Sequence, residues 1–404
     1  SRARFRRRKR LFWGVAYNLF WLLLFKYTGF FTENINGILR LMGLSLELPV
    51  FAPVLPVGIS FYTFQAISYL ADVYRKTAEY EPSFVNFAMY ISMFPQLIAG
   101  PIVRYSDIAA QLEDRTHSTA LAAEGIRRFI IGLGKKILLA NQLGELCGAF
   151  RASEEKSVLF YWLYALAFAL HIYFDFSGYS DMAIGLGKIF GFRFLENFNY
   201  PYISSSITEF WRRWHISLGT WFRDYVYIPL GGNRVGKYRH LLNILAVWVL
   251  TGFWHGAAWN FAVWGLLFAV LLMAEKMWLL KLLRKHKMIA RIYVLFFVLI
   301  SFVLFNADNM GQAFSDLAGL FGAGGIPLAS DEALYYLSSF SLILPIAIIG
   351  ATPLIKNGFE RLSKNCAAVR ILNIAEPIAL LAILLVMTAY LVDGSFNPFL
   401  YFRF

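Results

Sequence analysis

Long apolar stretches alternate with shorter polar ones along most of the chain. A transmembrane helix needs about 20 predominantly apolar residues to cross the hydrocarbon core of a bilayer. Stretches apolar enough to cross or enter a bilayer cover residues 11–31, 51–73, 84–103, 129–150, 158–176, 241–254, 259–280, 292–305, 337–354 and 374–392. This pattern predicts an all-α, polytopic integral membrane protein with about ten membrane helices.

Several of these stretches contain residues that interrupt a membrane helix. Pro56, Pro95 and Gly100 lie inside apolar stretches, and Lys135 and Lys136 place two charges inside another. Backbone that is not helical is tolerated at membrane depth only where protein or a water-filled cavity covers it. We therefore expect re-entrant helices around an interior rather than a simple bundle.

The segment 176–239 differs, because charged and aromatic residues mix there and no apolar run reaches spanning length. Within it, residues 206–224 have apolar side chains at steps of three and four, which is typical of an amphipathic helix. These apolar positions are Ile207, Phe210, Trp211, Trp214, Leu218 and Trp221. The polar side carries Glu209, Arg212, Arg213 and Arg223. We expect one helix lying in the membrane interface.

The composition agrees with a membrane protein. Of the 404 residues, 58% are apolar and 16% are charged, against roughly a quarter charged in soluble domains. These values argue against a water-soluble globule and exclude a disordered chain. The two cysteines, Cys147 and Cys366, are far apart in sequence and suggest neither a disulfide framework nor a thiolate metal site.

The positive charge is concentrated at the start of the chain. The net charge is +13, but seven basic residues lie within residues 1–10, which leaves +6 for the rest. A basic run before an apolar span is held on the cytoplasmic side, so we interpret 1–10 as a basic cytoplasmic segment and 11–404 as one membrane domain. A nucleic-acid-binding tail is the alternative. Because the first residue is Ser1, we expect a piece of a longer protein with further membrane helices upstream.

Motifs of other chemistries are incomplete. Residues 231–237 fit part of a phosphate-binding loop, but Tyr238 stands where the motif needs Ser or Thr. Gly185, Gly187 and Gly191 do not have dinucleotide-binding spacing, and helix packing through small residues explains them better. The sequence has no His-Glu-x-x-His or Gly-x-Ser-x-Gly motif. We expect no bound metal.

Three of the six histidines look ordinary, and a fourth, His171, has a structural interpretation. His117 lies in a polar loop, and His240 and His286 flank apolar stretches beside basic residues. His171 has Asp175 four residues later, a spacing at which the two side chains can pair on one helix face. We expect these four to be solvated or structural.

The other two histidines are candidates for chemistry. His255 stands at a break between two apolar runs, where burying an ionisable group is costly and indicates a functional site. Desolvation disfavours the imidazolium, and a neutral imidazole can act as a general base. A structural histidine bonded to a carbonyl is the alternative. His215, in the expected interfacial helix, is by itself more typical of a headgroup or packing residue.

Three sequence blocks around these histidines carry a family resemblance. They are residues 173–202 (YFDFSGYSDMAIGLGKIFGFRFLENFNYPY), 206–234 (SITEFWRRWHISLGTWFRDYVYIPLGGNR) and 251–260 (TGFWHGAAWN). They strongly resemble the membrane-bound O-acyltransferases, in particular the bacterial alginate O-acetyltransferase subfamily. That subfamily includes peptidoglycan O-acetylating proteins and is related to the D-alanyl transferases of teichoic acid. Residues 56–75, 94–104 and 397–404 support the same resemblance.

The resemblance implies roles for both histidines. His255 falls on the family's Trp-His-Gly motif and would be the catalytic residue, the general base on an acceptor hydroxyl. His215 falls on the second motif histidine and would bind or orient the acyl donor or move a proton. Helices would surround a thinned centre with a central tunnel, in which cytoplasmic acetyl-CoA meets an acceptor from the outer side. Acetyl-CoA would be a substrate, and no cofactor would be bound.

Donor and acceptor contacts are predicted less sharply. Arg212, Arg213 and Arg223 are candidates for contacting the phosphates of acetyl-CoA, although positive-inside loops and lipid headgroups call for the same residues. The acceptor would be an extracytoplasmic acetyltransferase partner protein or a polysaccharide, and not a nucleic acid.

These expectations describe a multi-pass enzyme of the bacterial inner membrane that O-acetylates a cell-surface polysaccharide, either alginate-like or peptidoglycan. A rival interpretation is a transporter or flippase for a lipid-linked glycan, which the broken helices support. The absence of a visible inverted repeat counts against this rival. A structural scaffold of a polysaccharide-secretion complex is the third possibility.

Overall fold

The protein is helical throughout the part that the computed structural model describes, residues 2–51, 53–394 and 399–400, and no strand occurs there. The α-helices are α1 (Arg2–Leu41), α2 (Ile59–Arg75), α3 (Phe84–Ser92), α4 (Phe94–Leu97), α5 (Tyr105–Glu113), α6 (Thr119–Gly134), α7 (Gln142–Ala152), α8 (Val158–Ile189), α9 (Ile207–Arg213), α10 (Ile216–Phe222), α11 (Lys237–His255), α12 (Trp259–Ala274), α13 (Leu280–Leu283), α14 (Lys287–Asn306), α15 (Met310–Gly319), α16 (Asp331–Ser339), α17 (Ile343–Gly350), α18 (Leu354–Leu362) and α19 (Cys366–Asp393). The all-α prediction is confirmed.

Short helices of other types connect several of these elements. Three are π-helical, namely η1 (Lys135–Asn141), η3 (Arg223–Tyr227) and η4 (Glu275–Leu279). Two are 3₁₀-helical, namely η2 (Pro201–Ile203) and η5 (Ala323–Gly325). The π-helical turns continue directly from α6, α10 and α12. Such turns are rare and frequent at functional sites, and η3 borders the site described below.

Three helices are long and apolar enough to cross a membrane among the residues described, namely α8, α14 and α19. The pair α16 and α17, bent by 61°, makes a fourth candidate if it is one span. Fewer single helices meet this test than the ten predicted stretches, because several stretches are divided. The stretch 84–103 contains α3, α4 and an extended end, so the break expected at Pro95 and Gly100 is present.

The core of the molecule is built around α8. This helix is buried on nearly every side and packs against α6, α7 and α14. Glycines let α6 and α8 approach closely, since an added Cβ at Gly132 would lie 2.6 Å from the carbonyl oxygen of Gly178, and one at Gly125 would lie 2.5 Å from that of Gly185. Packing through small residues, predicted for Gly185, is therefore confirmed.

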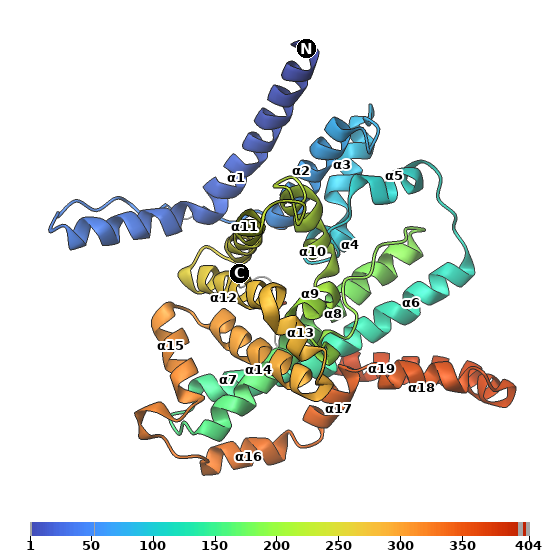
Figure 1. Ribbon diagram of the computed structural model, residues 1–404. Coiled ribbons are helices and arrows are strands. Elements are labelled where there is room, and N and C mark those ends of the chain that lie inside the picture. The colour runs from blue at the N-terminus through green and yellow to red at the C-terminus, as the bar shows by residue number, and fades with distance from the viewer. Residues whose placement is uncertain (1, 52, 395–398, 401–404) are drawn as a thin grey trace.

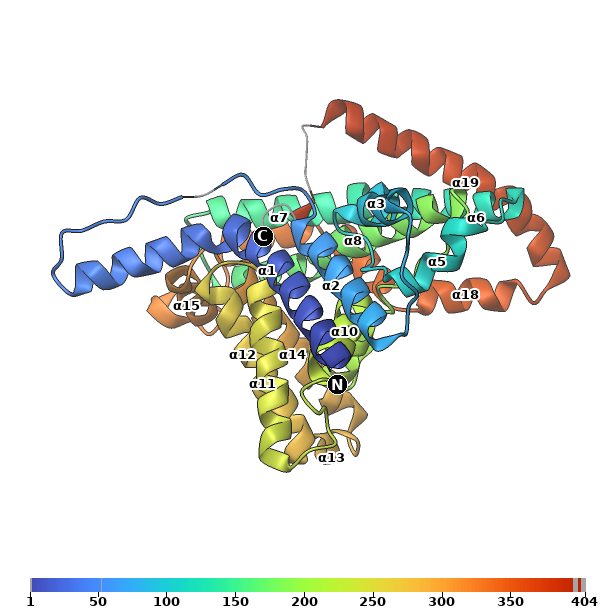
Figure 2. The same ribbon diagram turned by 90° about the horizontal axis from the view of Figure 1, so that it is seen from above.

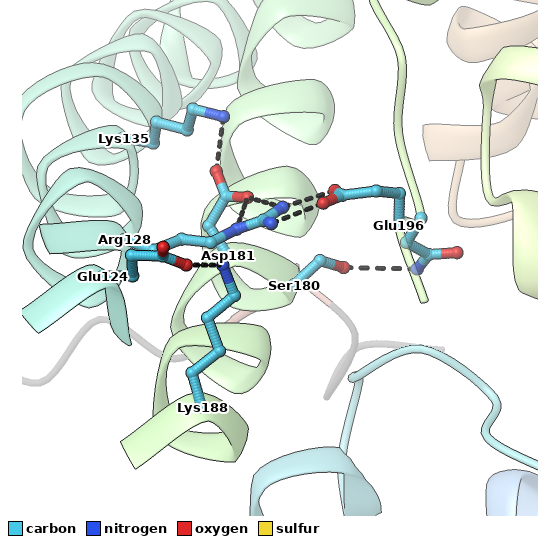
Figure 3. A network of polar contacts seen from close by, with 8 residues as sticks. Glu124, Arg128, Lys135, Ser180, Asp181, Lys188 and Glu196 are labelled. Carbon is cyan, nitrogen blue, oxygen red and sulfur yellow. Dashed lines mark hydrogen bonds and ion pairs between the residues drawn. The ribbon is translucent and has the colours of Figure 1, made fainter. Parts of the chain in front are cut away.

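A network of ion pairs and hydrogen bonds connects α6 with α8 and with the loop that follows α8 (Figure 3). Arg128 of α6 forms ion pairs with Asp181 of α8 and with Glu196 in the loop, and Lys135 Nζ lies 2.6 Å from Asp181 Oδ2. These partly buried charges are mutually paired, which offsets the cost of removing them from water. The network thereby fixes the start of the loop that leads to His215.

The remaining helices group around this core. α11, α12 and α14 lie beside one another, with α1 close to α11 (Figures 1 and 2). α18 and α19 lie at the edge of the molecule opposite α1 (Figure 1), and α19 is almost entirely exposed. The candidate site lies between the core helix α8 and the group formed by α11, α12 and α14.

Candidate active site

His255 is the last residue of α11. The helix ends there because Gly256 is extended, and an added Cβ at Gly256 would come within 2.1 Å of the ring of Phe261. The imidazole lies among aromatic rings, with its centroid 5.0 Å from Trp254, 5.1 Å from Trp264 and 5.4 Å from Phe305. Its Nε2 is buried and has no hydrogen-bond partner within the described part of the chain. This nitrogen is therefore not used in a hydrogen bond within the described part of the protein.

Helix α1 holds the end of α11 in place. Lys26 Nζ donates hydrogen bonds to the carbonyl oxygens of Trp254 (2.7 Å) and His255 (3.1 Å), and the Tyr27 hydroxyl donates to that of Phe253. The last carbonyls of a helix lack intrahelical partners and favour a cation. Sequence reasoning missed Lys26, although a lone lysine inside an apolar stretch is itself a signal of function.

His215 lies at a break in the expected interfacial helix. That prediction is wrong in one respect, because residues 206–224 form α9 and α10, and His215 between them has a φ of 45°. Backbone bonds explain the break: Ile216 N–H donates to the carbonyl of Asn197, and Asn199 N–H donates to that of Arg213, both at 2.9 Å. The two segments therefore bond to each other where a helix would have continued.

The side chain of His215 is oriented by Asn197. His215 Nδ1 lies 3.2 Å from Asn197 Oδ1, and Asn197 Nδ2 donates to Ser180 Oγ at 3.2 Å. The imidazole and the ring of Phe176 form an edge-to-face pair, with centroids 4.7 Å apart. Its Nε2 is buried without a partner among the described residues. Asn197 was not predicted, because its role depends on a loop contact that spacing does not reveal.

The two histidines line one cavity of about 60 Å³, which we call the chamber. Its lining residues are Phe61, Ala99, Ile172, Asp175, Phe176, Tyr179, Trp214, His215, Trp254, His255, Trp264, Phe302, Phe305, Phe399 and Leu400. The structure thus brings together the two histidines that stand 40 positions apart in the sequence. A chamber of this size has room for a small group or a few water molecules.

One wall of the chamber is fixed by a buried ion pair. Lys136 Nζ lies 2.6 Å from Asp175 Oδ1, and the other oxygen of Asp175 accepts the Leu400 N–H at 2.9 Å. The predicted pairing of His171 with Asp175 is therefore wrong. Asp175 takes the lysine because a full charge in the interior compensates the carboxylate better than a neutral imidazole does.

A groove of about 570 Å³, which we call the donor groove, reaches His215 from another side. Its lining residues are Thr208, Trp211, Arg212, His215, Ile216, Leu218, Gly219, Thr220, Phe222, Arg223, Tyr227, Ile244, Val247, Trp248, Thr251, Leu272 and Lys276. Three lining residues are cationic, Arg212, Arg223 and Lys276, and none is acidic. His215 belongs to both the chamber and the groove, so it stands where the two meet.

The three arginines predicted to meet the donor differ in placement. Arg212 and Arg223 line the donor groove, whereas Arg213 does not. Arg213 is paired with Glu209 at 2.9 Å and donates to the carbonyl of Asn199 at 3.2 Å. Two of the three candidate arginines therefore line the groove. The third, Arg213, connects α9 to the loop that contains Asn199.

Arg223 is held by an acidic neighbour outside the groove lining. Arg223 Nε lies 2.7 Å from Asp224 Oδ1, and Arg104 lies 2.8 Å from the other oxygen. Burial raises the pKa of Asp224, but hydrogen bonds from Arg223 and Arg104 and their charges lower it further, so the net pKa is below its ordinary value. The carboxylate is thus neutralised by two cations next to the groove.

A third cavity, of about 680 Å³, lies beside the loop that follows His255, and we call it the outer pocket. Its lining residues are Phe30, Glu33, Asn34, Gly37, Ile38, Leu41, Ala257, Ala258, Trp259, Asn260, Asp308, Asn309 and Met310. Its charged lining residues are both acidic, Glu33 and Asp308. Trp259 is half exposed and donates its Nε1–H to Asn34 Oδ1 at 2.8 Å.

The fold and this site define a polytopic membrane protein with an interior histidine that a basic groove approaches. Residues 8–310 match the MBOAT, membrane-bound O-acyltransferase, family, and the chain belongs to that family. The chain is therefore an O-acyltransferase of a multi-pass membrane type.

Relatives with curated names agree with this assignment. The chain is 38% identical over 421 residues to a probable alginate O-acetylase of Azotobacter vinelandii, covering 97% of this chain and 84% of that protein. It is 35% identical over 368 residues to a peptidoglycan O-acetyltransferase of Helicobacter pylori, covering 80% and 69%. It is 30% identical over 228 residues to a teichoic acid D-alanyltransferase of Bacillus subtilis, covering 54% and 58%.

Proposed function

We propose that this protein transfers an acetyl group from cytoplasmic acetyl-CoA to a hydroxyl acceptor outside the bacterial inner membrane, for O-acetylation of a cell-surface polysaccharide. The observation that carries the proposal is the unpartnered Nε2 of His255 in a chamber shared with His215. The similarity to an alginate O-acetylase and a peptidoglycan O-acetyltransferase supports acetyl transfer to a polysaccharide. About ten membrane helices around a central tunnel would connect the two sides.

His255 acts as the general base in this proposal. Its Nε2 takes the proton of the acceptor hydroxyl while the hydroxyl oxygen attacks the thioester carbonyl carbon. The tetrahedral intermediate then expels the CoA thiolate, which recovers the proton from the imidazolium. A positioned base contributes typically about 10²- to 10⁴-fold, and Lys26, by fixing the end of α11, holds that base in position.

The donor enters through the donor groove. Arg212 and Arg223 meet its phosphates, because guanidinium groups bind phosphate oxygens in pairs, and the apolar groove wall leads the thioester to His215. His215 then orients the acyl donor at the junction with the chamber. The small volume of the chamber favours acetyl over a long acyl chain.

The acceptor approaches from the outer pocket, since this pocket adjoins the loop directly after His255. An exposed tryptophan beside carboxylates and amides suits a hydroxyl-rich ligand, which can stack on the ring and donate hydrogen bonds. The ligand is a polysaccharide or an extracytoplasmic acetyltransferase partner protein that passes the acetyl group on.

Reconstitution in lipid vesicles tests the proposal. Vesicles holding the full chain receive labelled acetyl-CoA on the groove side and enclose an oligosaccharide acceptor, either an N-acetylglucosamine oligomer or an oligouronate. Acetyl transfer should occur with the wild type and fall by about 10²- to 10⁴-fold with His255→Ala. His286→Ala, a change at an exposed histidine outside the site, should retain activity. Undiminished transfer by His255→Ala would overturn the mechanism, and glycan movement without acetylation would support a flippase.

A further inference from the structure

Trp264 of α12 has an unusual polar atom. The side chain is 1% exposed and lines the chamber, yet its indole Nε1–H has no hydrogen-bond partner in the described part of the chain. Indole nitrogen is a donor only, and nearly all buried donors in proteins are bonded because an unmade bond is costly. Trp254, which lines the same chamber, does have an acceptor, the carbonyl of Ser60 at 3.5 Å. An acceptor atom of a ligand in the chamber would satisfy the N–H of Trp264.

The position of Trp264 relative to His255 is rigid. Their ring centroids are 5.1 Å apart at an interplanar angle of 82°. The helices that carry them meet through two glycines: an added Cβ at Gly252 would lie 2.3 Å from the carbonyl oxygen of Phe261, and one at Gly265 would lie 2.3 Å from that of Trp248. Because α11 and α12 cannot separate without losing this contact, the indole ring stays beside the imidazole ring.

We infer that the Nε1–H of Trp264 donates a hydrogen bond to the thioester oxygen of the acyl donor as that oxygen becomes an oxyanion. The inference rests on the proposed function. When the acceptor oxygen bonds to the carbonyl carbon, its proton passes to His255 Nε2 and the carbonyl π electrons move to the oxygen. The indole N–H stabilises that negative charge until the C–S bond breaks and the C=O bond reforms.

This role explains why the donor is left without a partner in the protein. A hydrogen-bond donor that is desolvated and held in place needs no reorganisation when negative charge develops on the substrate. Its stabilisation of that charge is greatest where water is excluded. Besides His255, the indole contacts the apolar rings of Phe268 and Phe305, with centroids at 5.1 and 5.2 Å. A protein acceptor at this position would compete with the oxyanion.

Trp264→Phe tests the inference, because it removes the N–H and keeps an aromatic ring. We expect acceptor-dependent release of CoA by the full chain in vesicles to fall by about 10²- to 10³-fold in kcat. The KM for acetyl-CoA should stay within about twofold, because the donor acts on the transition state rather than the ground state. Binding of S-ethyl-CoA, a thioether without a carbonyl oxygen, should also be unchanged.

A matched control separates chemistry from packing. Trp162→Phe removes an indole N–H that donates to the carbonyl of Leu320 at 2.9 Å, outside the chamber lining, so it should affect thermal stability without lowering kcat. If Trp264→Phe does not fold, β-(3-benzothienyl)alanine at position 264 keeps the bicyclic ring and replaces the N–H by sulfur. The inference fails if the folded variant retains wild-type kcat while His255→Ala is inactive. Activity of His255→Ala would instead overturn the proposed function.

Discussion

The donor groove and the outer pocket differ in the sign of their charge. The charged lining residues of the groove are Arg212, Arg223 and Lys276, whereas those of the outer pocket are Glu33 and Asp308. The groove meets the chamber at His215, and the outer pocket adjoins the loop that follows His255. The site is thus electrostatically asymmetric about its two histidines.

This difference supports the proposal of separate entrances for the two substrates. A polyphosphate donor is attracted by the groove and repelled by the outer pocket, since clefts lined by one sign of charge concentrate ligands of the other. A neutral, hydroxyl-rich acceptor is not repelled by carboxylates and can donate hydrogen bonds to them. In the proposed function the two reactants therefore use different entrances.

Among the substitutions that test this comparison, we expect the change at His215 to have the largest effect on activity. In His215→Ala the acyl donor loses a group at the end of the groove, so we expect kcat/KM for acetyl-CoA to fall roughly 10- to 100-fold, because small displacements of a reacting group are costly. The KM for the acceptor should change little. Steady-state kinetics with each substrate varied checks this.

His215→Asn keeps a polar side chain beside Asn197 and should recover part of the loss. His240→Asn is not a suitable control, because His240 is hydrogen-bonded to Tyr227 of the groove. His286 provides that control, as it lies outside all three cavities. Unchanged affinity for acetyl-CoA in His215→Ala would show that His215 does not hold the donor.

Trp259 tests the other region. Trp259→Ala removes the exposed ring of the outer pocket, and we expect the KM for a neutral oligosaccharide acceptor to rise by up to about tenfold, the magnitude of an aromatic contact. The KM for acetyl-CoA should not change. Trp278→Ala, at a similarly exposed tryptophan outside the pocket, is the matched control. A rise in the KM for acetyl-CoA with Trp259→Ala would mean that the two openings are not separate.

The same comparison shows what the sequence can predict. The sequence predicts His255 as a candidate because an ionisable residue at a break between apolar stretches is an anomaly in the hydropathy profile, and the resemblance adds a role for His215. Helical structure followed from apolar stretches of spanning length. The break between α9 and α10 did not, because it depends on hydrogen bonds to Asn197 and Asn199, and amphipathic spacing continues across it unchanged.

Contacts between distant segments account for the other differences. The partner of Asp175 is Lys136, 39 positions earlier, and not His171 on its own helix. Lys26 reaches the carbonyl of His255 from 229 positions away. A single sequence shows local spacing and charge but not which helices become neighbours, so pairings across helices were either missed or assigned to the nearest candidate.

Arg212 gives a smaller effect on the donor side. Arg212→Ala removes an exposed cation from the groove, and we expect the KM for acetyl-CoA to rise about two- to fivefold at low salt, as is usual for exposed ion pairs. The rise should shrink at high ionic strength because salt screens the interaction. Arg213→Ala is the comparison, since Arg213 is paired with Glu209 away from the groove. Equal effects of both changes would argue against specific phosphate contacts.

The substitution of Asp224 should have the smallest effect, and its effect on stability should depend on pH. The pKa of Asp224 is below its ordinary value, so its pairing with Arg223 and Arg104 stabilises the fold above about pH 4 and is lost as the pH falls through the lower folded-state pKa. Asp224→Asn should therefore cost about 1 kcal/mol or less at neutral pH, because solvent screens this pair, and the difference from wild type should vanish in acid. The change also removes the ion pair between Asp224 and Arg223, which frees Arg223 for the donor phosphates. The KM for acetyl-CoA should therefore stay constant or fall by about twofold. Thermal unfolding across pH, with Asp114→Asn at an exposed acid as control, measures the first effect. A higher KM would mean that Asp224 positions Arg223 for the donor rather than competing with it.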